Sequence, residues 1–203
     1  MIRGRMLFLP LVLLVVLAAP LTAQAFPIAP PGTEGLKIIV TGLGPVVASM
    51  ATYEGNSATY SNDLYLMLDG LGNPGDDGNL SNDLFVFNNH LSPVGSTMNL
   101  GTFAVGTELM FRLFVNNTGY NYYSGPASRN PDGMPHARVQ GNWQPNTTLV
   151  SFEDLYGTPE GVNGYNDLSF SFTNTSPAPE PSTLALLGIG VVGLTAGMRR
   201  KRV

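Results

Sequence analysis

Short apolar runs separated by turn-forming residues fill the middle of this chain, and they leave no room for long helices. Between residues 36 and 176, clusters of Gly, Asn, Asp and Pro repeatedly interrupt runs of β-branched, aromatic and leucine residues. No stretch there sustains the apolar period of a capped helix. This pattern predicts an all-β fold, a β-sandwich or jelly-roll-like single domain over residues 36–176.

The expected strands follow from these runs, and a Pro-rich lead-in (residues 26–35) precedes them. Residues 41–63 are rich in Gly, Ser and Thr, and their apolar residues are too scattered for a helix. The runs with the composition of strands are Leu36–Val40, Leu64–Leu68, Leu84–Phe87, Thr97–Phe103, Glu108–Val115, Ala137–Gln140, Thr148–Phe152 and Leu168–Thr173.

An Asn-Asp-Leu triplet opens three of these segments, at Asn62–Leu64, Asn82–Leu84 and Asn166–Leu168. Asn and Asp side chains bond nearby backbone N–H groups, so the pair closes a turn, and the leucine then begins an inward-facing alternation. A second interpretation is that the carboxylates also bind calcium, which prefers carboxylate, amide and carbonyl oxygens.

The strongest calcium candidate precedes the last expected strand, where Glu153, Asp154, Asn166 and Asp167 flank a loop that contains several glycines. These side chains are predicted to converge on one hard cation. A second acidic loop covers residues 69–79, and neither loop has the spacing of an EF-hand. The alternative for both loops is turn formation without a metal.

The charge of the central region excludes one class of partner. Residues 26–176 carry four basic and thirteen acidic side chains, a net charge of −9. Such a region repels nucleic acid phosphates. The chain has no cysteine, which excludes disulfides, thiol nucleophiles and thiolate metal sites.

The first 25 residues are typical of a secretory signal peptide. Arg3 and Arg5 form a charged start, Met6–Leu17 is apolar, and Ala23 and Ala25 provide the small residues of a cleavage site. Cleavage is expected after Ala25, with export of the remainder.

The last segment, residues 177–203, has three parts in a fixed order. A Pro-rich start is followed by an uncharged segment, which predicts a single transmembrane helix over about residues 182–198. The basic end, Arg199, Arg200, Lys201 and Arg202, is expected on the cytoplasmic side of a membrane.

This tail resembles the PEP-CTERM sorting signal of Gram-negative bacteria. Pro179, Glu180 and Pro181 form the tripeptide of that name, and Ser182 begins its usual continuation. The resemblance implies recognition by exosortase, a membrane-embedded protease, and delivery of the body to the cell surface or the extracellular matrix. It also implies an association with exopolysaccharide or biofilm, so extracellular polysaccharide is an expected partner. An ordinary single-pass anchor is the alternative.

Residues 105–173 resemble an uncharacterised bacterial extracellular β-domain that ends in a FEDL…YNDL motif. Phe152–Leu155 and Tyr165–Leu168 carry that resemblance, although YGTPEGVNG replaces the usual acidic glycine run between them. The family has no established activity, so the resemblance concerns fold and location.

Other chemistry has weaker support in the sequence. His90 and His136 form no recognisable metal pair, and no G-x-S-x-G nucleophile elbow is present. Tyr120, Tyr122, Tyr123 and Trp143 are candidates for stacking on sugar rings, or for packing over the edge of a sheet. We therefore expect a non-enzymatic exported protein. The alternative is a carbohydrate-binding module or a carbohydrate-active hydrolase on a β-sandwich.

Overall fold

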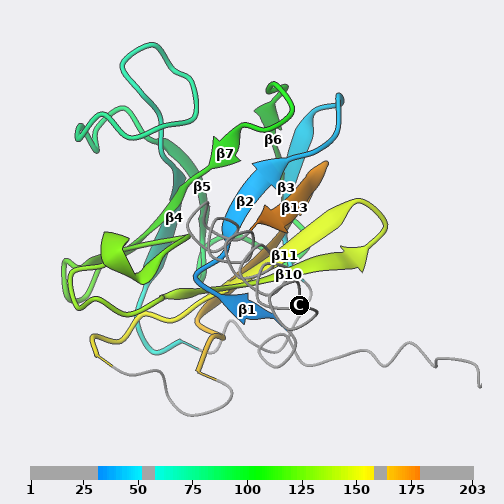
Figure 1. Cartoon of the computed structure of the whole chain (residues 1–203). Coiled ribbons are helices and arrows are strands. Elements are labelled where there is room, and N and C mark those ends of the chain that lie inside the picture. Colours follow the sequence, from blue (N-terminus) through cyan, green and yellow to red (C-terminus); the bar gives the residue numbers. More distant parts are fainter. Residues whose placement is uncertain (1–31, 52–57, 158–163, 179–203) are drawn as a thin grey trace, which may run out of the picture.

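The computed structural model describes residues 32–51, 58–157 and 164–178, which form antiparallel strands in three sheets (Figure 1). Within these residues the helical structure is one 3-10 turn, η1 (Ala127–Arg129). The prediction of an all-β fold is confirmed for the described residues.

The largest sheet has six strands among the described residues, and all its neighbouring strands are antiparallel. Its central strand β11 is buried along its whole length, whereas β3 alternates between buried and half-buried residues. In sheet order the strands are β1 (Thr33–Glu34), β10 (Ala137–Gln144), β11 (Thr147–Phe152), β12 (Leu168–Thr173), β3 (Val46–Met50) and β6 (Thr97–Gly101).

Two smaller sheets complete the described part of the fold. The four-stranded sheet contains, in order, β5 (Leu84–Asn88), β4 (Asn62–Leu66), β8 (Phe111–Val115) and β9 (Asn121–Tyr123). The three-stranded sheet contains β13 (Thr175–Ala178), β2 (Lys37–Val40) and β7 (Glu108–Leu109).

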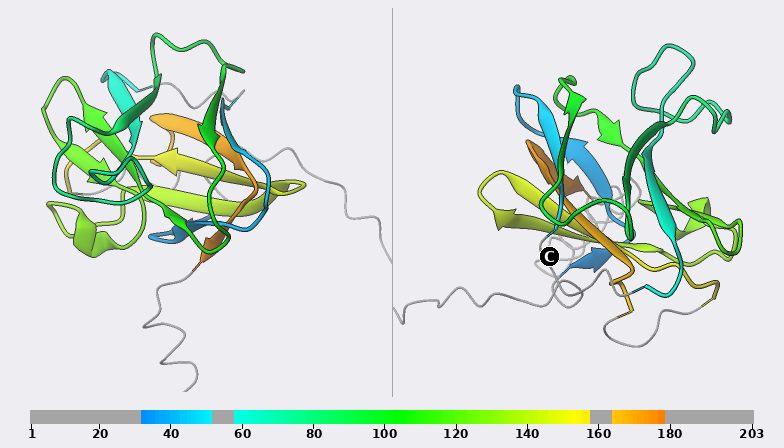
Figure 2. Two further views of the ribbon diagram at one scale, coloured as in Figure 1. Left: turned by 90° about the horizontal axis from the view of Figure 1, so that it is seen from above. Right: turned by 180° about the vertical axis from the view of Figure 1, so that it is seen from behind.

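All three sheets contribute to one hydrophobic core. Phe111 of β8 packs against Phe170 and Phe172 of β12, with ring centroids 5.8 and 4.3 Å apart. The six-stranded and four-stranded sheets therefore face each other across this core (Figure 2). Ile38 of β2 and Leu109 of β7, both fully buried, add the inner face of the three-stranded sheet.

Two continuous runs of chain pass from one sheet to another at a single residue. The expected strand Glu108–Val115 divides at Met110 into β7 and β8, which belong to different sheets. Asn174 separates β12 from β13 and has a positive φ of 57°, a conformation that asparagine tolerates better than most residues. Its side chain donates to the Pro45 carbonyl oxygen at 2.8 Å, which stabilises this corner.

Four of these strands were not expected from the sequence, namely β1, β3, β9 and β13. β1 and β9 are very short, β13 contains proline, and β3 lies within a stretch rich in Gly, Ser and Thr, so no long apolar run marks any of them. They form because a neighbouring strand supplies hydrogen bonds and an apolar surface. The last strand, β13, continues to Ala178, two residues beyond the expected end of the domain at residue 176.

Several expectations about the chain ends lie outside the described residues. These are the signal peptide (1–25) with Ala23 and Ala25, and the tail from Pro179 through its helix to Arg202. In the described ranges, no helix has the length and apolar character needed to cross a membrane.

Candidate metal centre

The pairing of β11 with β12 brings the predicted acids together. Phe152, the last residue of β11, lies opposite Leu168, the first residue of β12. Glu153 and Asp154 follow Phe152, and Asp167 precedes Leu168, so all three acids lie at the same edge of the sheet. The Asp167 N–H donates to the Phe152 carbonyl oxygen at 3.0 Å and continues the ladder into this edge.

The three carboxylates converge in the structure. One oxygen from each of Glu153, Asp154 and Asp167 lies within 4.8 Å of the others. Their exposed fractions are only 1%, 4% and 9%, so these charges are largely removed from water. Two backbone N–H groups also face the cluster: that of Asp154 donates to Asp167 Oδ2 at 2.8 Å, and that of Leu155 to Glu153 Oε1 at 3.0 Å.

A side chain from the facing sheet reaches the same cluster. Asn62, the first residue of β4, is fully buried, and its Nδ2 donates to Asp154 Oδ2 at 2.7 Å. The Oδ1 atom of Asn62 is buried and has no hydrogen-bond partner in the part of the chain that the structure describes. Asn89 fixes the Asn62 backbone, because its Oδ1 accepts the Asn62 N–H at 2.8 Å. The cluster therefore lies between the two facing sheets and includes a buried amide oxygen with unmet bonding capacity.

The electrostatics of the cluster favour the addition of positive charge. Burial, and next the neighbouring Asp154 carboxylate, raise the pKa of Asp167 to about 8. Like charges held close together in a site of low polarity disfavour simultaneous ionisation. A bound cation, or a proton, relieves that repulsion.

A second group of polar residues lies directly beside the acids. His136 is buried, its Nδ1 lies 2.9 Å from the Glu153 carbonyl oxygen, and its Nε2 lies 2.8 Å from Asp132 Oδ2. Both partners are acceptors, so each ring nitrogen faces an oxygen that can accept a hydrogen bond. Burial alone would raise the pKa of Asp132, but hydrogen bonds from the Gly157 N–H and His136 hold it below its ordinary value.

Tyr122 covers the His136 ring. The two rings stack with centroids 3.7 Å apart, and the Tyr122 hydroxyl is buried without a hydrogen-bond partner within the described residues. Burial raises the pKa of Tyr122, with further contributions from nearby carboxylates that include Asp154 and Glu153. The Tyr122 hydroxyl is therefore a second buried polar group near the cluster with unmet bonding capacity.

The fourth predicted ligand, Asn166, is not one of the three converging groups. It is half-buried and, with Asp154, Asp167 and Tyr60, lines a cavity of about 250 Å³ beside the cluster. The centre of the loop, residues 158–163, lies outside the described residues.

The other acidic loop, residues 69–79, uses its carboxylates for turns. Asp69 Oδ1 accepts the N–H groups of Leu71 and Asn73 at 2.9 and 2.8 Å. Asp76 accepts the Gly78 N–H at 2.9 Å. The hydrogen bond from the Asn73 backbone makes the largest contribution to lowering the pKa of Asp69. These contacts agree with the turn interpretation of this loop.

The three Asn-Asp-Leu triplets have different roles. Asp63 accepts from Asn88 Nδ2 at 2.7 Å, and Asp83 forms a buried ion pair with Arg112 at 2.9 Å. Asp167 belongs to the carboxylate cluster. The sequence repeat therefore marks strand entrances, and the third copy also supplies an acid to the candidate site.

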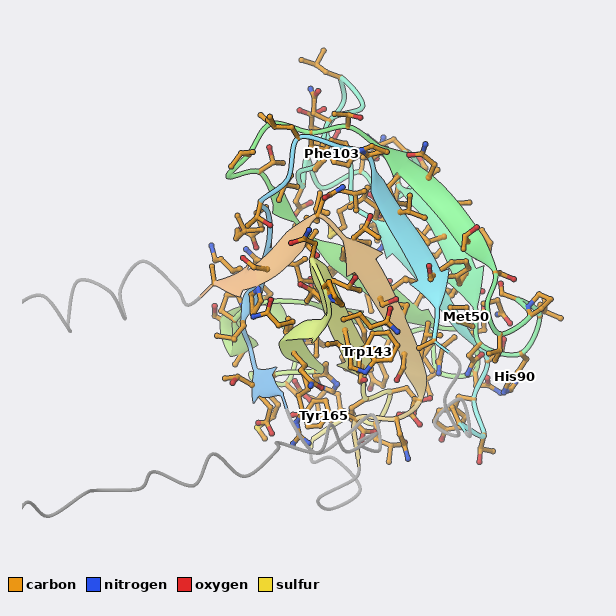
Figure 3. The ribbon with its side chains drawn as sticks, turned by 90° about the vertical axis from the view of Figure 1, so that its right-hand side faces the viewer. Met50, His90, Phe103, Trp143 and Tyr165 are labelled. Atoms are coloured by element: carbon orange, nitrogen blue, oxygen red, sulfur yellow. The ribbon has the colours of Figure 1, made fainter. Side chains whose placement is uncertain are left out.

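The aromatic residues proposed for glycan stacking differ in exposure. Tyr122 is fully buried against His136, so it offers no ring face to a sugar. Trp143 is half-buried and packs near Ala51 and Leu149 on the outer side of the six-stranded sheet (Figure 3), and Tyr123 is half-buried on β9.

A more exposed aromatic pair adjoins Tyr122, because the Tyr120 ring centroid lies 6.1 Å from that of Tyr122 and the Tyr156 ring lies next to Tyr120. Tyr120 and Tyr156 are 43% and 56% exposed, with ring centroids 5.3 Å apart.

His90 lies at the periphery of the molecule (Figure 3), where its Nε2 is 2.9 Å from the Ala58 carbonyl oxygen.

Sequence comparison adds one finding, at the end of the chain. Residues 177–201 match the PEP-CTERM protein-sorting motif. The chain carries a PEP-CTERM sorting signal. This signal implies export, and a membrane-anchored precursor that exosortase, a membrane protein, processes. The comparisons with curated proteins and with solved structures found no match.

Proposed function

We propose that this chain is a non-enzymatic surface protein of a Gram-negative bacterium, associated with exopolysaccharide or biofilm matrix. The PEP-CTERM motif at residues 177–201 is the observation that carries the proposal. In the precursor, the signal peptide is removed after Ala25, residues 182–198 span the membrane, and Arg199–Arg202 stay on the cytoplasmic side. After processing, the β-sandwich ectodomain resides at the surface or in the matrix.

Replacing Pro179, Glu180 and Pro181 by alanine tests the sorting step. We expect a full-length precursor that stays in the membrane fraction, measured by immunoblotting of membrane, surface and medium fractions. A matched control replaces Pro30 and Pro31 of the lead-in by alanine and should be processed normally. Normal release of the tail variant would contradict the proposal.

The proposal that the body is not a hydrolase rests on the burial of the clustered acids Glu153 and Asp154. A glycosidase needs two carboxylates that flank a sugar, about 5 to 9.5 Å apart. Here Glu153 is 1% and Asp154 4% exposed, and each lies in the boundary between sheets. Hydrolysis of extracellular glycans by the purified protein, abolished in Asp154→Asn, would overturn this part of the proposal.

We further propose that the body binds one calcium ion at Glu153, Asp154 and Asp167. Two oxygens on opposite sides of a calcium ion are separated by about 4.6 to 5.2 Å, since each lies 2.3 to 2.6 Å from the metal. The three carboxylates, within 4.8 Å of one another, have suitable spacing. Asn62 presents its Nδ2 to Asp154, so its amide would have to turn over for the buried Oδ1 to join the three carboxylates. Asn166 lines the adjoining cavity. Carboxylate and amide oxygens are the hard donors that calcium prefers.

The calcium ion would connect the two facing sheets. Glu153, Asp154 and Asp167 belong to the end of the six-stranded sheet, whereas Asn62 begins β4 of the four-stranded sheet. A ligand that binds only the folded state stabilises it by about 2.7 kcal/mol at a hundredfold excess over its dissociation constant. That corresponds to several degrees in melting temperature for a domain of this size.

Thermal unfolding of the exported protein in millimolar calcium and in chelator tests this site. We expect a higher melting temperature with calcium, a much smaller difference in Asp167→Ala and Asn62→Ala, and poor substitution by magnesium, which prefers smaller octahedral sites. Asp69→Asn, at an acid already satisfied by its own turn, is the matched control and should retain the full difference. Equal melting temperatures with calcium and chelator would leave the acids as turn formers.

A carbohydrate-binding module is the second candidate function, and the Tyr120–Tyr156 pair supports it. Exposed tyrosine rings stack on the apolar faces of sugars, and this pair projects from two loops. Binding to a glycan array, lost in Tyr156→Ala and kept in Trp143→Ala, would support a lectin-like role. Absence of glycan binding by the wild-type protein would count against it.

A further inference from the structure

The sorting signal overlaps the folded body. The matched motif begins at Pro177, whereas β13 continues to Ala178. Pro177 and Ala178 lie opposite Ile38 and Lys37 of β2, in an antiparallel ladder. The Pro179–Pro181 tripeptide therefore follows the last paired residue directly, with no spacer between sheet and signal.

β13 is held firmly at its start and less firmly at its end. Thr175 is 4% exposed, and its carbonyl oxygen accepts the Thr148 hydroxyl at 2.9 Å. By contrast, residues 176–178 are only half-buried, and Pro177 has no N–H to donate to the ladder. The Pro177 ring lies against Gly141. A Cβ atom added at residue 141 would lie only 2.7 Å from the Pro177 Cδ atom. The strand thus has a fixed inner end and a less buried outer end, whose opening would uncover the neighbouring core residue Ile38.

Proteolytic enzymes act on chain segments that have opened locally, and firmly folded segments resist them. The residues just before the tripeptide are folded into a sheet. An enzyme that binds the tripeptide therefore also contacts the end of β13. We infer that the exosortase-like enzyme takes residues 176–178 as part of its substrate, by lifting the outer end of β13 from β2 while Thr175 stays in place. This inference rests on the proposed sorting function.

A reversible crosslink tests it, because the chain contains no cysteine of its own. Lys37→Cys with Ala178→Cys joins a directly opposed pair of residues at the outer end. We expect the oxidised variant to be processed at least tenfold more slowly than wild type, and reduction to restore processing. Ile39→Cys with Ser176→Cys, two pairs further in, provides a second lock and should behave in the same way.

Matched controls separate strand release from side effects of the cysteines. Each single-cysteine variant should be processed normally. Ser49→Cys with Thr97→Cys crosslinks β3 to β6 in the six-stranded sheet. The oxidised form of this variant should be processed at the wild-type rate. A six-residue Gly-Ser insertion between Ala178 and Pro179 should restore processing of the oxidised outer lock, because the enzyme then gains free chain from the insertion.

Two results would overturn the inference: processing of the oxidised locks at the wild-type rate, or a locked variant that the insertion does not rescue. The alanine variant of Pro179–Pro181 separates this failure from failure of the sorting proposal. If that variant is blocked while the locks are processed, only the release of β13 is excluded. If it is processed normally, the sorting proposal itself fails.

Discussion

At Asp154, side chains and backbone from both facing sheets meet at one residue. Its Oδ2 accepts from Asn62 Nδ2 at 2.7 Å, and its own N–H donates to Asp167 Oδ2 at 2.8 Å. These contacts connect the start of β4, the end of β11 and the approach to β12. Because all three side chains are buried, a change in charge at this point acts on the packing between sheets as well as on any bound ion.

Asp167→Asn should have opposite effects with and without calcium. The folded-state pKa of Asp167 is raised to about 8, so between pH 4 and that value the folded protein holds a proton that the unfolded chain has lost. The stability of the folded protein therefore falls as pH rises through this window. Above the window, the destabilisation caused by the ionised Asp167 carboxylate is fully present. In chelator at pH 8 the asparagine variant should melt about 3 °C higher than wild type, equivalent to about 1 kcal/mol.

In calcium the same variant should melt lower than wild type, because it lacks a carboxylate ligand. Differential scanning calorimetry from pH 5 to pH 8.5, in chelator and in calcium, measures both signs. A variant that is less stable than wild type in chelator at pH 8 would show that Asp167 is not held in a repulsive cluster.

The acids of this site could be predicted from the sequence, but the amide from the opposite sheet could not. Glu153, Asp154 and Asp167 flank two neighbouring strands, so their proximity follows from one hairpin-like pairing. Asn62 reaches Asp154 across 92 positions, and no local pattern encodes that contact. Its triplet predicted a strand entrance, which it forms, and the calcium interpretation of the triplets concerned their carboxylates and not this amide. Tyr122 was named from the sequence as a candidate for sugar stacking, but its burial was not predicted, since its stacking on His136 depends on how the sheets pack.

At the scale of elements, Arg112 of β8 fixes the four-stranded sheet to its long connecting loop. Its Nε donates to Asp83 Oδ2 at 2.9 Å, its Nη1 to Asn121 Oδ1 at 2.8 Å, and its guanidinium lies 4.2 Å from the centre of the Tyr65 ring. Residues 67–83 project from the sheets between β4 and β5 (Figure 1), and Asp83 ends this projection. One cation therefore connects β8, β9, β4 and the entrance to β5.

Arg112→Ala should be among the most destabilising substitutions at a polar position. The Asp83 side chain is 1% exposed, so its charge would be left buried without its cation, at a cost of about 3 to 5 kcal/mol. Arg129→Ala breaks a shorter but more exposed pair with Glu108 and should cost about 1 kcal/mol or less. Urea unfolding of both variants measures the difference, and equal losses would contradict the role given to Arg112.

At the scale of the whole molecule, β2 and β13 lie side by side, so the last described strand pairs with the second one in one small sheet (Figure 1). The sequence predicted β2 from its apolar run but not β13, whose Thr-Ser-Pro-Ala composition has little strand propensity. β13 forms because β2 lacks a partner on that side and because the corner at Asn174 directs the chain there. The last turn of the fold is thus determined by tertiary contacts.

Truncation within this strand should show where the body ends. A chain that stops after Ala178 should unfold at the same urea concentration as the processed protein. A chain that stops after Asn174 loses every β13 pair and uncovers Ile38, so it should be less stable by about 2 kcal/mol or more. Equal midpoints for the two truncations would mean that β13 contributes nothing to the body.

The antiparallel pairing of β13 also determines how the body bears mechanical load. A pull on the tail is directed along the strand and away from Thr175, so it loads the four pairs with β2 together, in shear. Lifting Ala178 sideways instead breaks those pairs one after another, as in a zipper. If the body is held by its tail, the pull of flowing liquid loads β13 in shear, and a large force is needed to separate it from β2. A protease that lifts the strand from the side needs a smaller force. Single-molecule stretching through the tail and through a handle beside Ala178 should give clearly different rupture forces.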